Sequence, residues 1–436
     1  MLAEGETGIP SNMGIIPAND DFKLTEDRIK AALSRSRDFQ LLSFSRSENE
    51  DSEFISKIKY SEETFEVIIY ISQTANIGLS EFGFANQIAK EDFDNALRQP
   101  SFVEVSMFFG EDVLDSFHLQ LKIMDTIVPD ASLVVDFMSF RLLSAKWLKM
   151  TARASVPPSP DYLYSLHAVY KENAGRTEYW FHTHGLLRCR SVELEVMNVF
   201  DGAQQMNDLV TMVVKKFIQD PAKENEKFQI GYDGLGINLS WLRWEEALND
   251  FPKDILGGRE DRNGDENVHA GPSGILFAVE DKNMVSPEIY AKTLGDNPIF
   301  YISNEETMRM STLAKERFSF FTDVFNKYGK PKSKSFFSKL FGKKKEQDTP
   351  WSLLVKLGLT VDDAKAETEK EHLWYKVMEI EGNRIRGELL NQPYWISGLN
   401  EGDVNDYSMD LLTDWIIYSP DGHTYTTDSI YQLGYS

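Results

Sequence analysis

The sequence changes character abruptly between Lys330 and Lys345, and this change most limits how the chain can fold. Seven lysines and no acidic residue fall in this stretch, whereas the rest of the chain carries 39 of the 46 basic side chains and all 69 acidic ones. A segment with so much like charge cannot bury a core of its own. We therefore predict a linker at 330–350, with a long body before it and a separate module at 351–436.

The bulk composition predicts a cytoplasmic globular protein. The 436 residues, 42% of them hydrophobic, are enough for two to three packed domains. No run approaches the ~20 consecutive apolar residues that a membrane-spanning helix needs. The first 21 residues hold neither lysine nor arginine, so we expect no secretory signal. The single cysteine, Cys189, excludes an internal disulfide and favours a reducing compartment.

The charge of the chain limits its partners. A formal net charge of −23 opposes binding to DNA or RNA, because attraction to phosphates needs a basic surface. We therefore expect no nucleic-acid partner. The same charge favours solubility and a basic protein partner.

Hydrophobic periodicity predicts an α+β protein whose body begins with a mixed α/β domain. Residues 1–37 are expected to form a loose leader and a short helix with Thr25 as its N-cap. Within 38–155, alternating apolar residues predict a strand, and apolar residues at three- and four-residue spacing predict an amphipathic helix. Prolines at 157, 158 and 160 mark the end of this domain.

The middle and C-terminal parts are predicted to be richer in strands. Residues 156–329 should form an α+β domain with an antiparallel set of strands, at 162–170, 178–184 and 192–199. A helix from Met310 to Phe325 is expected to close the body. The module at 351–436 has alternating runs at 373–380, 384–389 and 411–418, which predict a small β-rich fold.

The sharpest chemical pattern is a strand pair that carries His182, His184, Glu193 and Glu195. Residues two apart in a strand share a face, so the two histidines point the same way, as do the two glutamates. A turn near Leu187 would place His182 opposite Glu193. Two imidazoles and two carboxylates on adjacent strands can bind zinc, iron or manganese. The alternative is a polar ladder on a solvated sheet face, which needs no metal.

Cys189 is the other reactive side chain near this strand pair. It lies between Arg188 and Arg190, whose guanidinium groups would lower the pKa of a neighbouring thiol. No nucleophile signature surrounds it. We expect a structural cysteine and predict no catalytic residue.

The predicted linker interleaves aromatic residues with lysines. As a short helix it would gather Phe336, Phe337 and Phe341 on one side, followed by Lys343, Lys344 and Lys345. This composition is typical of a weak contact with a membrane surface or with an acidic partner. The alternative is a linker that its lysines keep soluble.

The C-terminal module has the most recognisable sequence. From Glu371 it reads Glu-His-Leu-Trp-Tyr-Lys-Val, and it continues with Glu-Gly-Asn-Arg-Ile-Arg-Gly-Glu-Leu-Leu-Asn-Gln-Pro from Glu381. A Gly-Asp pair at 402–403 and a Leu-Thr-Asp-Trp motif at 412–415 follow. This pattern resembles the bacterial domain of unknown function 2314. Five residues that match the pattern are candidate binding residues: Trp374, Asn391, Asp403, Asp414 and Trp415. Each also has a structural explanation, since asparagine before proline forms turns and tryptophan fills small cores.

The body resembles the uncharacterised family 4026, most clearly between Trp180 and Glu195. Neither resemblance implies a chemistry. The sequence contains no nucleophile motif, phosphate loop or dinucleotide fingerprint, so we interpret the chain as a bacterial factor that binds another protein, with no cofactor expected. Some related small bacterial families resemble toxin-immunity proteins, and an acidic chain suits a basic toxin. The alternative is a metal-dependent hydrolase built on the histidine and glutamate strand pair.

Overall fold

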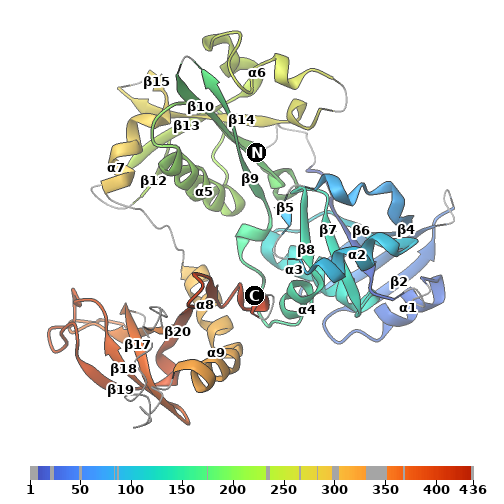
Figure 1. Cartoon of the computed structure of the whole chain (residues 1–436). Coiled ribbons are helices and arrows are strands. Elements are labelled where there is room, and N and C mark those ends of the chain that lie inside the picture. Colours follow the sequence, from blue (N-terminus) through green and yellow to red (C-terminus); the bar gives the residue numbers. More distant parts are fainter. Residues whose placement is uncertain are drawn as a thin grey trace, which may run out of the picture. The chain divides into compact units, whose positions relative to one another are not determined.

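The computed structural model of the chain forms two compact units. It describes residues 8–19, 24–48, 52–82, 84–85, 88–173, 175–231, 236–264, 267–281, 283–296, 304–329, 351–366 and 369–433. Unit 1 comprises Met1–Arg153 and Pro157–Tyr301, and unit 2 comprises Ala154–Val156 and Ile302–Ser436 (Figure 1). The predicted α+β class is confirmed, with strands and helices in both units.

The first half of unit 1 is a mixed sheet with helices packed on it. Its described strands run in the order β2-β3-β4-β6-β1-β7-β8-β5, with bounds β1 Ser11–Pro17, β2 Gln40–Arg46, β3 Glu53–Tyr60, β4 Glu63–Gln73, β5 Phe84–Ala85, β6 Ser101–Met107, β7 Ala131–Asp136 and β8 Arg141–Ser144. The helices are α1 Glu26–Ser34, α2 Lys90–Arg98, α3 Val113–Ile127 and α4 Ala145–Ala152. Helices α1, α3 and α4 pack together, and α2 packs against β7.

The N-terminal leader prediction requires a correction. Residues 11–17 form β1, which lies between β6 and β7 inside the sheet. The strand is held there because Met13, Ile15 and Ile16 are completely buried. The apolar run in this segment is too short to show the alternation that identifies a strand, so the sequence did not predict β1. The helix after it begins as predicted, with the Thr25 hydroxyl accepting the Arg28 N–H.

The second half of unit 1 is built on the predicted antiparallel strands. Its described strands run in the order β12-β13-β14-β11-β10-β9, with β15 paired to β14. Their bounds are β9 Ser165–Asn173, β10 Arg176–His184, β11 Glu193–Val199, β12 Phe228–Ile230, β13 Ile237–Arg243, β14 Ser273–Glu280 and β15 Asn283–Val285. The helices are α5 Ala203–Gln219, α6 Trp244–Ala247 and α7 Ala291–Asp296, and α5 packs along the sheet (Figure 1).

Unit 2 is a sheet of six described strands in the order β19-β18-β17-β16-β20-β21. Their bounds are β16 Ser352–Thr360, β17 Lys370–Glu381, β18 Arg384–Leu389, β19 Val404–Ser408, β20 Leu412–Tyr418 and β21 Thr424–Thr426. The predicted small β-rich fold is therefore confirmed. Helices α8 Asn304–Glu316 and α9 Phe318–Val324 complete the unit.

The place of these two helices corrects the predicted boundary at 329. They were expected to close the body, but α8 packs on β20, and the Trp415 indole donates to the Ala314 carbonyl at 3.0 Å. Arg309 of α8 also forms an ion pair with Asp428 at 2.7 Å. An amphipathic pattern shows that a helix covers a sheet but does not show which sheet it covers, so the sequence alone could not assign these helices.

The predicted linker at 330–350, including Phe336, Phe337, Phe341 and the lysines at 343–345, lies outside the described residues. Its predicted contact with a membrane surface or a partner therefore stays a prediction. Among the described residues, no helix has both the length and the apolar character needed to cross a membrane.

Candidate functional site

Three histidines from two neighbouring strands meet on one face of the second sheet of unit 1. His167 of β9 pairs directly with His182 of β10, and His184 follows two residues later on the same face. One ring nitrogen of each lies within 4.8 Å of the corresponding nitrogens of the other two. The predicted pair, His182 and His184, is thus joined by a histidine that the sequence analysis did not select.

The spacing of the three rings is that of ligands around one metal ion. The centroids are 5.1 Å apart for His167 and His182, 4.9 Å for His167 and His184, and 5.0 Å for His182 and His184. With metal–nitrogen bonds of ~2.0–2.1 Å, tetrahedral coordination places the centroids of two imidazole rings about 5 Å apart. The three side chains could therefore coordinate one ion with small ring rotations.

The hydrogen bonds of His167 define its protonation pattern. The Ser165 hydroxyl lies 3.1 Å from His167 Nε2 and donates its hydrogen to the Ser139 carbonyl at 2.7 Å. A hydroxyl has only one hydrogen, so Ser165 must accept the Nε2–H of His167. The lone pair of the ring then resides on Nδ1. Metal-binding histidines are usually oriented in this way, by a hydrogen bond from the nitrogen that does not bind the metal.

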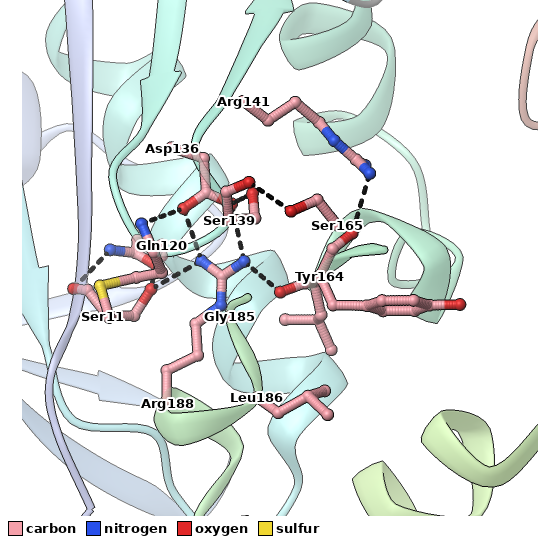
Figure 2. A network of polar contacts seen from close by, with 12 residues as sticks. Ser11, Gln120, Asp136, Ser139, Arg141, Tyr164, Ser165, Gly185, Leu186 and Arg188 are labelled. Atoms are coloured by element: carbon pink, nitrogen blue, oxygen red, sulfur yellow. Dashed lines mark hydrogen bonds and ion pairs between the residues drawn. The ribbon is translucent and has the colours of Figure 1, made fainter. Parts of the chain in front are cut away.

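This hydrogen bond is anchored in a buried polar network that joins the two halves of unit 1 (Figure 2). The Ser139 hydroxyl donates to Asp136 at 2.5 Å, and Asp136 forms a fully buried ion pair with Arg188 at 2.7 Å. Figure 2 shows Ser139 and Ser165 beside this pair. The network therefore fixes Ser165, and Ser165 in turn fixes the His167 ring.

A fourth histidine completes the cluster from a loop. The His269 ring lies 4.5 Å from that of His182 and 5.2 Å from that of His184. Arg262 is buried and donates to the His269 carbonyl at 3.0 Å and to the Gly257 carbonyl at 3.0 Å. The loop that carries His269 is thus held over the sheet by a guanidinium group.

Glu195, a predicted ligand, supports this loop instead. It is the residue paired with His182 across β10 and β11, which corrects the expected pairing of His182 with Glu193. Its carboxylate accepts from Arg262 at 2.9 and 2.6 Å, from the Trp180 indole at 2.7 Å, and from the Ser273 hydroxyl. Both oxygens are therefore occupied by donors.

Glu193, the other predicted carboxylate, is bound by donors other than the histidines. One of its oxygens accepts the backbone N–H groups of residues 185, 186 and 187 at 2.8, 2.9 and 3.3 Å. The other accepts the Thr183 hydroxyl at 2.7 Å. The structure thus brings together two of the four predicted residues and uses the two glutamates as hydrogen-bond acceptors around them.

Burial keeps the four histidines neutral. Burial, followed by the neighbouring rings, lowers the pKa of His182 to about 2 and that of His184 to about 3. Burial also lowers the pKa of His167 to about 4, and it lowers that of His269. Each ring therefore keeps a lone pair at neutral pH. His182 is only 3% exposed, and its Nδ1 has no hydrogen-bond partner within the described residues, which leaves a buried polar atom unsatisfied.

The turn between β7 and β8 packs against the cluster. Phe140 adopts a φ of 51°, a left-handed conformation that is strained for a bulky side chain. Its ring meets His184 edge-on at 4.9 Å. Arg141 follows and donates to the carbonyls of Asp161 at 3.1 Å and Tyr164 at 2.8 Å, next to Ser165 (Figure 2). Strain of this kind is concentrated at functional sites.

Cys189 is buried beneath this region, and burial raises the pKa of its thiol to about 12 in spite of Arg188. The thiol is therefore protonated at neutral pH.

The five candidate residues of the C-terminal module lie in different environments. Trp415 is fully buried, and Asp414 is nearly so. Asn391 accepts the Trp374 N–H at 3.2 Å, and Asp403 accepts the Asn400 N–H at 2.8 Å, so both carboxamide and carboxylate shape the loop after β18. Trp374 is half-buried beneath the Lys356 ammonium group, 5.4 Å from the ring centroid. These contacts fit structural roles.

The same loop exposes two aromatic side chains that the sequence analysis did not select. Tyr394 is 87% exposed and Trp395 is 66% exposed. Their backbone N–H groups donate to the buried carboxylate of Glu371 at 2.8 and 3.0 Å, and Ser397 binds Asp362 at 2.6 Å. The loop is therefore fixed by hydrogen bonds while its aromatic rings face solvent.

His167 and His269 had no sequence signal that would have grouped them with His182. His167 lies in a predicted strand, so alternation could place it on a face, but nothing in the sequence specified which strand lies beside it. His269 lies in a loop far along the chain, where no periodicity applies. Only the fold brings these side chains together.

Comparison with known families gives three matches along the chain. Two family models match the body: "Protein of unknown function (DUF4026) N-terminal" over residues 11–158 and "Protein of unknown function (DUF4026) C-terminal" over residues 166–277. The model "Uncharacterized protein conserved in bacteria (DUF2314)" matches residues 330–432. Searches of curated proteins and of solved structures found no match. All four histidines of the cluster lie within the second match.

Proposed function

The chain belongs to the DUF4026 family, with a DUF2314 domain at its C-terminal end, and we propose that its body binds a divalent transition metal through His167, His182 and His184. The observation that carries the proposal is the meeting of three neutral imidazoles, each with one ring nitrogen within 4.8 Å of those of the other two. A buried nitrogen of His182, Nδ1, has no partner among the described residues, and an ion bound through Nδ1 would satisfy it.

The donor set favours zinc or iron. Imidazole nitrogen suits these metals, whereas manganese, magnesium and calcium prefer the oxygen ligands that Glu193 and Glu195 do not provide here. Three protein ligands leave a coordination position for water, and zinc lowers the pKa of such a water to ~7. Metal-assisted hydrolysis is therefore the reaction class that suits the site, which supports the alternative of a metal-dependent hydrolase.

Metal analysis of the full-length chain tests this proposal. The protein is purified without a histidine tag or a chelating resin, incubated with Zn²⁺ and dialysed, and its zinc content is measured. We expect one ion per chain, lost when His182→Ala and His184→Ala are combined. Two histidines of unit 2, His372 and His423, provide matched controls, because changing either to glutamine should leave the stoichiometry unchanged. A folded wild-type protein that retains no zinc would contradict the proposal.

A second function, binding of a basic protein partner, is supported by the loop that exposes Tyr394 and Trp395. Exposed aromatic side chains on a preorganised loop are typical of the residues that dominate binding energy at protein interfaces. The carboxylates that hold the loop, Asp362, Glu371 and Asp403, make its surroundings acidic. A basic partner, such as the basic toxin considered in the sequence analysis, would complement this surface through charge and cation–π contacts.

Affinity purification from the native cell tests the partner proposal with a paired variant. Tyr394→Ser combined with Trp395→Ser should abolish recovery of a basic protein that the wild-type chain retains. Tyr418, an exposed aromatic residue of β20, offers the matched control as Tyr418→Ser. Equal recovery by wild type and the loop variant would rule out this surface.

A further inference from the structure

The surroundings of the histidine cluster indicate what the metal would bind. We propose that its open coordination position takes a phosphate group, held by the metal ion, the His269 imidazole and the charge of Arg141. This inference rests on the proposed metal site. It concerns the fourth position, which the three strand histidines leave vacant.

The balance of charge at a metal-loaded site favours an anion. Three neutral imidazoles leave the full charge of a divalent ion in place. The carboxylates around the cluster already have donors, because Glu195 pairs with Arg262 at 2.6 Å and Asp136 pairs with Arg188 at 2.7 Å. Glu193 accepts the Thr183 hydroxyl and three backbone N–H groups. Asp261 lies near His269 but is exposed, so solvent screens its charge. A metal-loaded site would therefore be cationic in a chain whose net charge is −23, and it would attract anions.

Arg141 supplies a positive charge close to the cluster. Its guanidinium binds the Tyr164 carbonyl at 2.8 Å, one residue before the Ser165 that orients His167. The residue before it, Phe140, places its ring edge-on against His184 at 4.9 Å, so Arg141 follows directly on a residue that contacts the cluster. The facing carboxylate, Asp136, is already paired with Arg188. The Nε atom of Arg141 is buried and has no partner within the described residues.

The histidines also differ in burial, and one of them is free to act as a hydrogen-bond donor instead of a metal ligand. His182 and His184 are buried, whereas His167 and His269 are half-buried and therefore closer to solvent. His269 contacts two of the three proposed ligands without belonging to the converging group. A neutral imidazole there can donate one N–H to an oxygen bound to the metal. A divalent tetrahedral anion has enough oxygens to contact the metal, this donor and a nearby guanidinium at the same time. A carboxylate has only two oxygens and one negative charge, so it cannot satisfy all three groups.

Cobalt spectroscopy on the full-length protein tests the inference, with inorganic phosphate as the probe. Co²⁺ is added to the metal-free chain, and its visible absorption bands are recorded during titration with phosphate, phenyl phosphate or acetate. We expect phosphate and phenyl phosphate to change the bands and acetate to bind at least roughly tenfold more weakly, because acetate makes fewer hydrogen bonds to the charged groups. Acetate that binds as tightly as phosphate, or phosphate that leaves the bands unchanged, would overturn the inference.

Variants separate this inference from the metal site itself. Arg141→Met should weaken phosphate binding by roughly tenfold or more while Co²⁺ still binds with one ion per chain, and Arg141→Lys should restore most of the affinity. Lys171→Met is the control, because it removes a cation from the strand that carries His167. Lys171 already pairs with Glu178 at 3.4 Å, so this change should have little effect on the affinity for phosphate. If the wild-type chain shows no cobalt bands, the metal proposal fails. If cobalt binds normally and Arg141→Met binds phosphate like wild type, only the role of Arg141 in phosphate binding fails.

Discussion

Ser165 accepts the Nε2–H of His167 across 3.1 Å, because the single hydrogen of its hydroxyl is already donated to the Ser139 carbonyl. This relationship fixes the lone pair of His167 on Nδ1 and holds the ring beside His182. The orientation is set by side chains outside the cluster. It depends on a chain of contacts that ends in the buried pair of Asp136 and Arg188.

Removing this hydrogen bond should weaken metal binding without unfolding the protein. We expect Ser165→Ala to lower the affinity for Zn²⁺ by about 10–100-fold, the usual effect of losing an outer hydrogen bond to a metal ligand. Ser165→Thr keeps the hydroxyl and suits a strand, so it serves as the control. Competition with a chromophoric chelator measures the affinity. Unchanged affinity in Ser165→Ala would show that Ser165 does not orient His167.

His118 should make unit 1 sensitive to acid. Burial, followed by Lys122, lowers the pKa of His118 to about 4, and its Nε2 binds the Thr151 carbonyl at 3.0 Å. A depressed histidine pKa means that the unfolded chain binds a proton more readily. Neutral His118 therefore makes its full contribution to stability at pH values above about 6.5, the pKa of histidine in the unfolded chain. This contribution is lost as the pH falls toward 4.

The size of this effect can be measured with a neutral replacement. In the metal-free protein, His118→Gln should reduce the loss of unfolding free energy between pH 7 and pH 4 by on the order of 1–3 kcal/mol. Urea denaturation followed through the tryptophans of unit 1 measures it. An identical pH slope in wild type and variant would show that His118 does not titrate as the structure requires.

Asp414 should have the opposite effect in unit 2. Burial raises its pKa from 3.8 to about 7, although the Trp415 N–H and Lys356 oppose the change. The folded state then binds the proton more tightly, so the contribution to stability is complete below 3.8 and is lost as pH rises through 7. Asp414→Asn keeps an acceptor for the Trp415 N–H and should raise the unfolding free energy at pH 8 by on the order of 1–3 kcal/mol. A destabilised Asp414→Asn protein at pH 8 would indicate that the carboxylate is favourably charged.

The packing of α8 on β20 predicts how a cleaved chain behaves. A site-specific protease sequence placed within 330–350 allows the chain to be cut after folding. The two fragments should elute together in size-exclusion chromatography, because Trp415 and Arg309 join segments on both sides of the cut. They should separate in urea. Fragments that separate without denaturant would show that 351–436 forms a unit without α8 and α9.

The sequence predicted some of this architecture, and the limits have physical causes. Alternation identified β9, β10 and β11 and correctly placed His182 and His184 on one face, because a strand has a period of two. The pairing between β10 and β11 was predicted wrongly, with His182 opposite Glu193 instead of Glu195. The reason is that residues 185–192 form a short helical turn and a connection instead of a tight hairpin. The position of His182 opposite Glu195 depends on the length of that connection.

The missing members of the site depend on tertiary contacts. His167 joins the cluster because β9 pairs with β10, and His269 joins because Arg262 and Glu195 anchor its loop. Strand order and loop docking have no local period that a sequence reveals. The same limit explains α8, whose apolar face was clear while the sheet that it covers was not.

X-ray absorption at the zinc edge is the most direct test of the central claim, that His167, His182 and His184 bind one metal ion. The account predicts about three imidazole nitrogens at ~2.0–2.1 Å from zinc in the wild-type chain. It also predicts loss of this imidazole scattering when His182→Ala and His184→Ala are combined. Zinc surrounded by water or carboxylate oxygen alone, or a spectrum that the double substitution leaves unchanged, would contradict it.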